Sequence, residues 1–146
     1  YWNHLPFKLV KGEVLNIDVS LPVDKVINRG VFILPKNGRH SVGSTYEHND
    51  LSYIPSEKGI KNLEDRLSKL YQGKYDIINV TAGIRPATYD RRPFIGKHPE
   101  HPAVSIFNGF GTKGVSLVPY FAGQYVNYLL QGGELMPEVD VTRVKL

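Results

Sequence analysis

The sequence predicts an α+β protein with a largely antiparallel or mixed sheet, one covering helix, and a further strand, loop and helix at the C-terminal end. Three observations carry this prediction. Residues 7–44 contain apolar runs separated by glycines and turn residues, which is typical of strands. Residues 56–73 carry leucines at helical spacing. An apolar run at residues 104–107 leads through a glycine-rich loop into an amphipathic helix.

The first half of the chain is expected to form three strands. Residues 7–19 form the first, with a bulge or bend at Gly12. Residues 26–34 form the second. Pro35-Lys36-Asn37-Gly38 closes a hairpin onto residues 39–44, because Asn-Gly readily adopts the positive φ angles that such a turn requires.

A helix and a fourth strand follow. Residues 47–55 are polar and irregular, and Ser56 is a suitable N-cap. Gly73 is a suitable end for the helix. Apolar side chains recur within it at three- and four-residue steps, at Ile60, Leu63, Leu67 and Leu70. Residues 75–82 then have strand propensity.

The C-terminal helix is expected to begin near Val115 or Ser116, which leaves Pro119 in its first turn, where no N–H is required. One face carries Val118, Phe121, Ala122, Tyr125, Val126 and Leu129. A strand that feeds such a helix through glycines leaves unpaired N–H groups at the positive end of the helix dipole. An anion or the electron-rich edge of a cofactor could bind there.

Residues 109–114, GFGTKG, satisfy the pattern G-x-G-x-x-G between a strand and a helix. A complete dinucleotide site also needs a second parallel strand that ends in an acidic residue about twenty positions on. Glu134 has roughly this spacing but lies in a turn. Three interpretations therefore stay open: a complete dinucleotide site, glycines kept for tight packing, and a loop along a cofactor edge.

Few other residues suggest chemistry. Arg85, in GIRP, could hold a carboxylate through two parallel hydrogen bonds, or could pair with Asp90. His98 and His101 flank prolines and are expected in a surface turn, with no metal site. No nucleophile elbow is present, and we predict no catalytic side chain.

Composition excludes several classes. The chain has 146 residues, enough for one compact domain or two unequal parts, and its net charge of +4 comes from dispersed residues, so nucleic-acid binding is not expected. The absence of cysteine excludes disulfides and thiolate chemistry. No apolar run reaches the length of a membrane span. Residues 1–10 have neither the basic start nor the small-residue cleavage pattern of a signal peptide, so nothing in them indicates secretion. We expect a cytoplasmic protein, and a piece of a longer one because it begins in mid-pattern.

Four segments resemble motifs of the FAD-dependent amino-acid oxidases of the D-amino-acid oxidase superfamily, particularly its glycine oxidase and sarcosine oxidase branch. The strand LPFKLVKGEVLNID and the hairpin VFILPKNGRHSVGST are similar to two of them. AGIRPATYDRRPFIG resembles the family signature G-[LIV]-R-P-x-[TS]-x-D-x-x-P-x-[IL]-G. NGFGTKGVSLVP resembles the family segment G-[HFL]-x-x-x-G-[IVL]-x-x-[AGS]-P, which lies along the edge of the flavin. The spacing of the last two, about twenty-five residues, makes the combination specific.

The resemblance implies that residues 1–82 are a partial substrate-binding domain. Residues 83–146 would hold the signature and the C-terminal strand and helix of the FAD domain, whose N-terminal FAD-binding unit is absent. Arg85 corresponds to the arginine that holds the substrate carboxylate. The residues along the flavin would be Gly109, Phe110, Gly111, Thr112, Lys113, Gly114, Val115 and Ser116.

The implied reaction is oxidation of the C–N bond of an amino acid or related amine. Hydride passes to FAD, the imine hydrolyses, and oxygen is reduced to peroxide. A neutral amine is required, so activity should fall at low pH. The isolated chain is expected to bind FAD weakly or not at all and to be inactive, with an exposed surface through which it could form a homo-oligomer.

The chain departs from the family at the substrate positions. Phe32 replaces a substrate-gating tyrosine, Thr112 replaces a second arginine beside Lys113, and Ser116 replaces the carboxylate lysine of the sarcosine oxidases. The substrate therefore stays open. Two alternatives also stay open: the FAD domain of a tRNA wobble-uridine modifying enzyme, and a non-enzymatic α+β binding module.

Overall fold

The computed structural model describes residues 1–21 and 24–144 and divides the chain into two compact units. One unit is Val10–Ile84; the other combines Tyr1–Leu9 with Arg85–Leu146. These units differ at the N-terminus from the expected division after residue 82, because the first nine residues belong to the C-terminal unit. The physical reason is Leu5, which is buried in a hydrophobic cluster with Phe94 and Ile106.

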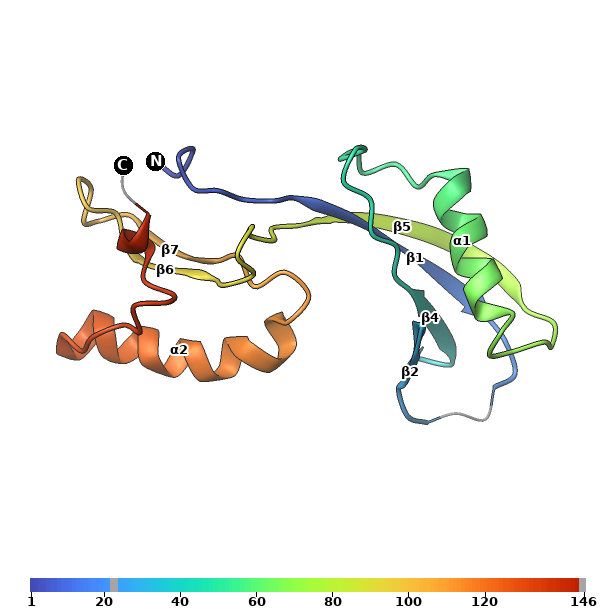
Figure 1. Ribbon diagram of the computed structural model, residues 1–146. Helices are drawn as coiled ribbons and strands as arrows, with labels where there is room; N and C mark the ends of the chain where they lie inside the picture. The colour runs from blue at the N-terminus through green and yellow to red at the C-terminus, as the bar shows by residue number, and fades with distance from the viewer. Residues whose placement is uncertain (22–23, 145–146) are drawn as a thin grey trace. The chain divides into compact units, whose positions relative to one another are not determined.

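The first unit is built on a five-stranded sheet in the order β2-β3-β4-β1-β5 (Figure 1). Neighbouring pairs β2/β3, β3/β4 and β4/β1 are antiparallel, which confirms the predicted class. β5 lies at one edge of the sheet. The strands are β1 (Val10–Asp18), β2 (Ile27–Arg29), β3 (Val31–Lys36), β4 (Arg39–Gly43) and β5 (Asp76–Arg85).

Two turns shape the hairpins of this sheet. Asn37 and Gly38 have φ angles of 50° and 77°, so the predicted Asn-Gly turn between β3 and β4 is confirmed. The prediction of a single strand over residues 26–34 is wrong. Gly30, with φ of 77°, reverses the chain, and β2 folds back on β3.

The irregularity expected at Gly12 lies instead on the neighbouring strand. β1 runs unbroken through Gly12. Val14 is opposite Gly43, whereas the Glu13 carbonyl accepts a hydrogen bond from Thr45 N–H at 3.3 Å. Ser44 is therefore one extra residue at the end of β4, as in a bulge.

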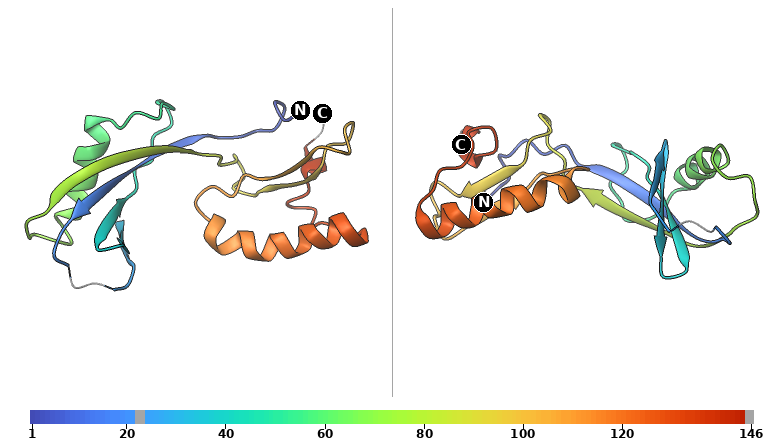
Figure 2. Two further views of the ribbon diagram at one scale, coloured as in Figure 1. Left: turned by 180° about the vertical axis from the view of Figure 1, so that it is seen from behind. Right: turned by 90° about the horizontal axis from the view of Figure 1, so that it is seen from below.

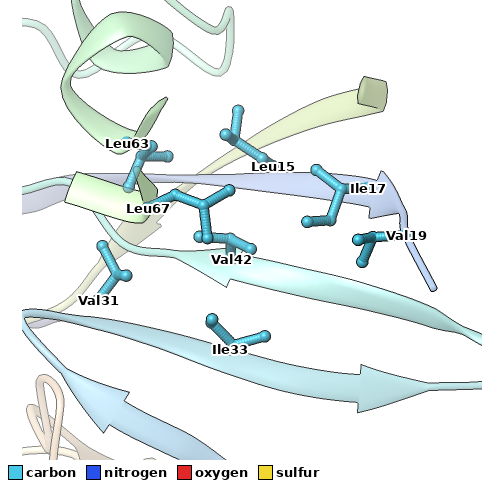
Figure 3. Close-up of a cluster of buried hydrophobic side chains, with 8 residues drawn as sticks. All are labelled: Leu15, Ile17, Val19, Val31, Ile33, Val42, Leu63 and Leu67. Atoms are coloured by element: carbon cyan, nitrogen blue, oxygen red, sulfur yellow. The ribbon is translucent and has the colours of Figure 1, made fainter. Parts of the chain in front are cut away.

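α1 (Glu57–Leu67) packs on one face of the sheet. The Ser56 hydroxyl accepts a hydrogen bond from Gly59 N–H, which confirms the predicted N-cap. The helix ends at Leu67, six residues before Gly73, because the chain turns there and brings Leu70 against the core. The core between helix and sheet contains Leu15, Ile17, Val19, Val31, Ile33, Val42, Leu63 and Leu67 (Figure 3).

The second unit consists of a two-stranded hairpin and a long helix. β6 (Phe94–Lys97) pairs antiparallel with β7 (Ser105–Asn108), and α2 (Gly114–Gln131) runs along this hairpin (Figure 2). A short 3₁₀ helix, η1 (Val141–Arg143), packs against β6. The sequence did not reveal β6, because four residues with a central glycine give no strand pattern.

α2 differs from its predicted form in two respects. It begins at Gly114, so Pro119 lies in the second turn and leaves the Val115 carbonyl without its helical partner. The face that packs is also displaced from the predicted one. Val126 and Leu129 are exposed, whereas the residues that contact the core of this unit are Leu117, Phe121, Tyr125 and Tyr128.

The N-terminal segment is anchored through His98. This side chain is buried, and its Nε2 lies 3.1 Å from the Tyr1 carbonyl, while its Nδ1 accepts a hydrogen bond from Glu100 N–H. The expectation that His98 lies at the surface is therefore wrong, because the N-terminal residues cover it. No group of three metal-ligating side chains occurs among the described residues.

Among residues 1–21 and 24–144, no helix has the length and apolar character needed to cross a bilayer.

Candidate functional site

The glycines of the loop before α2 differ in what requires them. At Gly109, φ is 86°, and a Cβ would lie 2.8 Å from the Thr88 methyl group, so close packing explains this glycine. Gly111 has φ of 54°, but a Cβ there would make only ordinary contact, 3.5 Å from that of Ala87. Gly114 has neither constraint, because its nearest neighbour would be 3.7 Å from a Cβ. The fold itself therefore does not explain Gly114, whereas the close approach of a ligand would.

At the N-terminus of α2, no side chain caps the backbone N–H groups and no acidic residue offsets the helix dipole. Its N-cap, Lys113, makes no side-chain capping hydrogen bond, and the first turn contains no acidic residue. Thr112, Val115 and Ser116 are exposed, and Val115 is 95% accessible. The loop is held from below by Phe110, whose ring lies 4.8 Å from that of Phe107. These donors suit an anion or the electron-rich edge of a flavin.

The complete dinucleotide interpretation lacks its second strand. β7 pairs antiparallel with β6, and no strand follows α2 in the part of the chain that the structure describes. Glu134 lies in an irregular segment. Within the described residues, the glycine loop therefore does not lead into the parallel βαβ unit that grips a dinucleotide pyrophosphate.

Arg85 is the last residue of β5 and is half-buried. Its carbonyl accepts a hydrogen bond from Ala87 N–H at 2.9 Å, which turns the chain at Pro86. The glycine loop packs against this segment, because a Cβ on Gly111 would lie 3.5 Å from that of Ala87. The structure thus brings the loop beside the residues that follow Arg85.

Asp90, the ion-pair partner considered for Arg85, pairs with Arg143 at 3.2 Å. Burial acts to raise the pKa of Asp90, but the N–H of Arg92 and the guanidinium of Arg143 outweigh it, so the pKa lies below its ordinary value. Arg143 also donates hydrogen bonds to the carbonyls of Pro93 and Arg92 and lies 4.0 Å from the centre of the Phe94 ring. The Arg143 side chain therefore holds the end of the signature segment in place.

The start of the signature segment is held by residues 7–8, which precede β1. Lys8 N–H donates a hydrogen bond to the Ala87 carbonyl at 2.7 Å, and Phe7 forms an isolated antiparallel β-bridge with Thr88. The buried Thr88 hydroxyl donates to the Arg92 carbonyl at 2.9 Å. Sequence reasoning missed the supporting roles of Thr88 and Arg143. The signature contains Thr88, but no pattern singles out Arg143 near the C-terminus.

Phe32 lies in the other unit, on the sheet face opposite α1. Its neighbours Val31 and Ile33 point into the core, so strand alternation directs Phe32 away from it. It is directly opposite Gly43 in the β3/β4 register, and Val14 is opposite Gly43 on the other side. This part of the face offers an aromatic ring and a methyl surface.

The same unit contains a buried charged cluster that sequence reasoning missed. Lys11 is fully buried and pairs with Asp50 at 2.5 Å and with Glu13 at 3.7 Å. Its ammonium also donates to Ser52 Oγ and the Ile54 carbonyl. The cluster fixes the loop before α1. A lysine within an apolar strand was the available signal.

A comparison with protein families identifies the class of protein to which this chain belongs. Residues 2–129 match the family described as FAD dependent oxidoreductase, abbreviated DAO, so the class is that of the flavin-dependent oxidoreductases. The chain belongs to this DAO family. The resemblance to the D-amino-acid oxidase superfamily is thereby confirmed.

Individual relatives agree with this assignment. Glycine oxidase of Bacillus subtilis is 32% identical over 136 residues, which are 88% of this chain and 36% of that protein. The crystal structure of glycine oxidase from Geobacillus kaustophilus is similar with a TM-score of 0.75 and 28% identity, covering 90% of this chain and 37% of that one. The chain thus spans little more than a third of these relatives.

A second group of relatives is also similar. The tRNA 5-methylaminomethyl-2-thiouridine biosynthesis bifunctional protein MnmC of Leptospira interrogans is 27% identical over 103 residues, which are 62% of this chain and 15% of that protein.

Proposed function

We propose that this chain is part of an FAD-dependent oxidase that oxidises the C–N bond of an amino acid or a related small amine. The observation that carries the proposal is the N-terminus of α2, where an uncapped helix end, an unconstrained Gly114 and exposed loop residues coincide. The similarity to glycine oxidases supports the substrate class. Membership of an oxidoreductase family favours an enzyme over the non-enzymatic binding module.

The residues of the loop fit the pyrimidine edge of a flavin. FAD, when bound, supplies the acceptor for two electrons and a hydride. The N–H groups at the start of α2 would stabilise negative charge at that edge, aided by the helix dipole. Residues 109–116 would contribute backbone contacts, with the Thr112 and Ser116 side chains on the exposed side.

Arg85 is proposed to hold the substrate carboxylate. A planar guanidinium can donate two parallel hydrogen bonds, which fixes the orientation of the α-carbon as well as its position. The hydrogen bonds that surround residues 87–93 restrain the backbone after Arg85 and reduce the entropy lost on binding. Phe32 is proposed to contact the apolar part of the substrate.

The exposed apolar side chains of α2 support the proposal that further protein packs on it in the full-length parent. Val115, Val126 and Leu130 are 95%, 53% and 79% accessible, although a helix of this apolar character normally lies inside a protein. We therefore propose that the isolated chain is inactive. The expected cytoplasmic location and the possible homo-oligomer stay predictions.

The test begins with FAD. The purified chain and its full-length parent are each titrated with FAD, and the structured flavin absorbance spectrum is recorded. We expect a stoichiometric yellow complex with the parent alone. Failure of the parent to bind FAD would reject the proposed function, and a stoichiometric complex with the isolated chain would reject its proposed inactivity.

Activity of the parent tests the role of Arg85. Peroxide release is measured with glycine and with N-methylglycine. Arg85→Ala should lower kcat/KM by about 100-fold, the loss of a charge-assisted pair, and Arg85→Lys should restore little because it cannot form two parallel hydrogen bonds. Arg91→Ala is the control, since this side chain is exposed. An Arg85→Ala enzyme with unchanged kinetics would remove Arg85 from the site.

The similarity to MnmC proteins favours one second candidate, oxidation of a modified uridine in tRNA. This second reaction would use the same glycine loop beside the flavin, with a larger amine as substrate. Peroxide release with an aminomethyl-substituted nucleoside, but not with free amino acids, would favour it.

A further inference from the structure

We propose that the end of the β3–β4 hairpin binds a small organic phosphate in a pocket lined by Lys36, Arg39 and His40. The pocket has a volume of about 380 Å³, which is the size of a site for a small organic ligand. Its described lining residues all belong to Val10–Ile84 and include neither Arg85 nor the glycine loop. Binding in this pocket therefore does not depend on the proposed oxidation.

His40 is a buried histidine that the fold leaves without a partner. It is 5% exposed, yet neither ring nitrogen has a hydrogen-bond partner among residues 1–21 and 24–144. Strand alternation places it on the same face of β4 as Val42, which belongs to the hydrophobic core. A buried polar group without a partner is destabilising, and an apolar side chain would avoid that cost. Packing alone therefore does not explain a histidine here, whereas a ligand that pairs with the imidazole would.

Two cations accompany this histidine. Lys36 and Arg39 are directly opposite each other in the β3/β4 register, and both are exposed. Like charges in directly opposite positions repel each other. Neither residue forms an ion pair with any residue that the structure describes, and no acidic residue is among the described residues of the pocket. The rim of the pocket is therefore positively charged, and a bound anion would offset the repulsion.

These groups match a phosphate better than a carboxylate. A phosphate monoester carries a charge of about −1.5 to −2 at pH 7 and has three acceptor oxygens. Two cations would balance this charge, and an imidazole offers at least one N–H donor in either protonation state. The apolar residues of the pocket, Val19, Leu21 and Pro35, suit a carbon group attached to the phosphate.

Calorimetric titration of the full-length parent tests the pocket. The probes are phenyl phosphate, inorganic phosphate and phenol, and FAD is present in excess so that a nucleotide site cannot take them. We expect saturable binding of one phenyl phosphate per chain, weaker binding of inorganic phosphate, and no binding of phenol. The absence of saturable binding by phenyl phosphate would overturn the proposal.

Substitutions locate the bound phosphate. Lys36→Ala and Arg39→Ala should each weaken phenyl phosphate binding about tenfold or more, the loss of one charge-assisted contact. His40→Leu should weaken binding similarly and also raise the melting temperature, because it removes the unpartnered polar group. Lys36 and Arg39 are exposed, so their variants can be measured even if His40→Leu fails to fold. Lys69→Ala is the matched control, since this exposed lysine lies outside the pocket.

A second hollow shares the two cations on the other face of the sheet, where Asn16, Ser41 and Asn79 line it. Asn79→Ala distinguishes the two faces and should leave the affinity for phenyl phosphate unchanged. A loss as large as that expected of His40→Leu would move the phosphate to the other face and overturn the proposal. Unchanged affinity in both Lys36→Ala and Arg39→Ala would overturn it as well.

Discussion

The carboxylate of Glu13, in β1, packs directly on Gly59 in the first turn of α1, where even a methyl group would overlap Glu13 Oε2. The same carboxylate accepts hydrogen bonds from the N–H and hydroxyl groups of Ser56, at 2.7 and 2.9 Å. Thr45 donates to its other oxygen at 3.0 Å. A buried acid thus fixes where the helix begins and how closely it approaches the sheet.

The first prediction concerns Gly59. Alanine favours a helix more than glycine, yet Gly59→Ala should lower the free energy of unfolding by about 2 kcal/mol, because overpacking displaces Glu13. Chemical denaturation of this chain and of the parent would measure the effect. Gly123→Ala, with no neighbour within 4 Å of its Cβ, should instead stabilise slightly. If Gly59→Ala were also stabilising, the contact with Glu13 would not constrain the helix.

The second prediction concerns Lys11. Lys11→Met keeps the volume but leaves Glu13 buried without its cation, so the melting temperature should fall by about 10 °C or more. Lys58→Met is the matched control, since that side chain is 89% exposed and its ion pair with Glu47 is long, at 3.8 Å. Equal effects of the two substitutions would contradict a structural role for the buried cluster.

The third prediction is a pH dependence. Hydrogen bonds from Lys11 and then from Ser52 lower the pKa of Asp50 from 3.8 to about 2. The folded state therefore holds the proton less tightly than the unfolded state, so this contribution to stability is complete above the unfolded pKa. It is lost as the pH falls from about 4 to about 2. Asp50→Asn should flatten the dependence of stability on pH in this window, measured by denaturation at several pH values.

The fourth prediction concerns Arg143. Arg143→Ala removes hydrogen bonds to two carbonyls and the stacking on Phe94, which should destabilise the second unit by about 1–3 kcal/mol. Arg143→Lys should recover only part of this, because lysine lacks the planar fork. Hydrogen exchange at residues 88–95 reports the local loosening. Unaltered exchange rates there would show that other contacts hold the signature segment.

The fifth prediction separates the glycines of the loop. Gly114→Ala meets no atom closer than 3.7 Å and should fold normally, but its methyl group should weaken FAD binding to the parent about tenfold or more. Gly109→Ala should instead disrupt the fold itself, because φ is 86° and Thr88 is in the way. Flavin absorbance and thermal melting of each variant distinguish the two effects. Normal FAD affinity of Gly114→Ala would argue against close cofactor approach at this residue.

Local patterns in the sequence were sufficient for the α+β class, the Asn37-Gly38 turn and the capped helix after Ser56. These features depend on backbone preferences and on side-chain spacing, which neighbouring residues determine. The motifs around Arg85 and Gly109 were likewise sufficient to identify the family. Their proposed site roles stay predictions.

Tertiary structure alone decided which contacts join distant residues. Burial of Leu5 joins the first nine residues to the C-terminal unit, and Arg143 pairs with the distant Asp90. The Phe32 ring leaves no room for a Cβ at Gly43, its partner on the neighbouring strand. No local pattern encodes such pairs. Their energies come from excluding water and from shape complementarity between segments that meet only after the chain has folded.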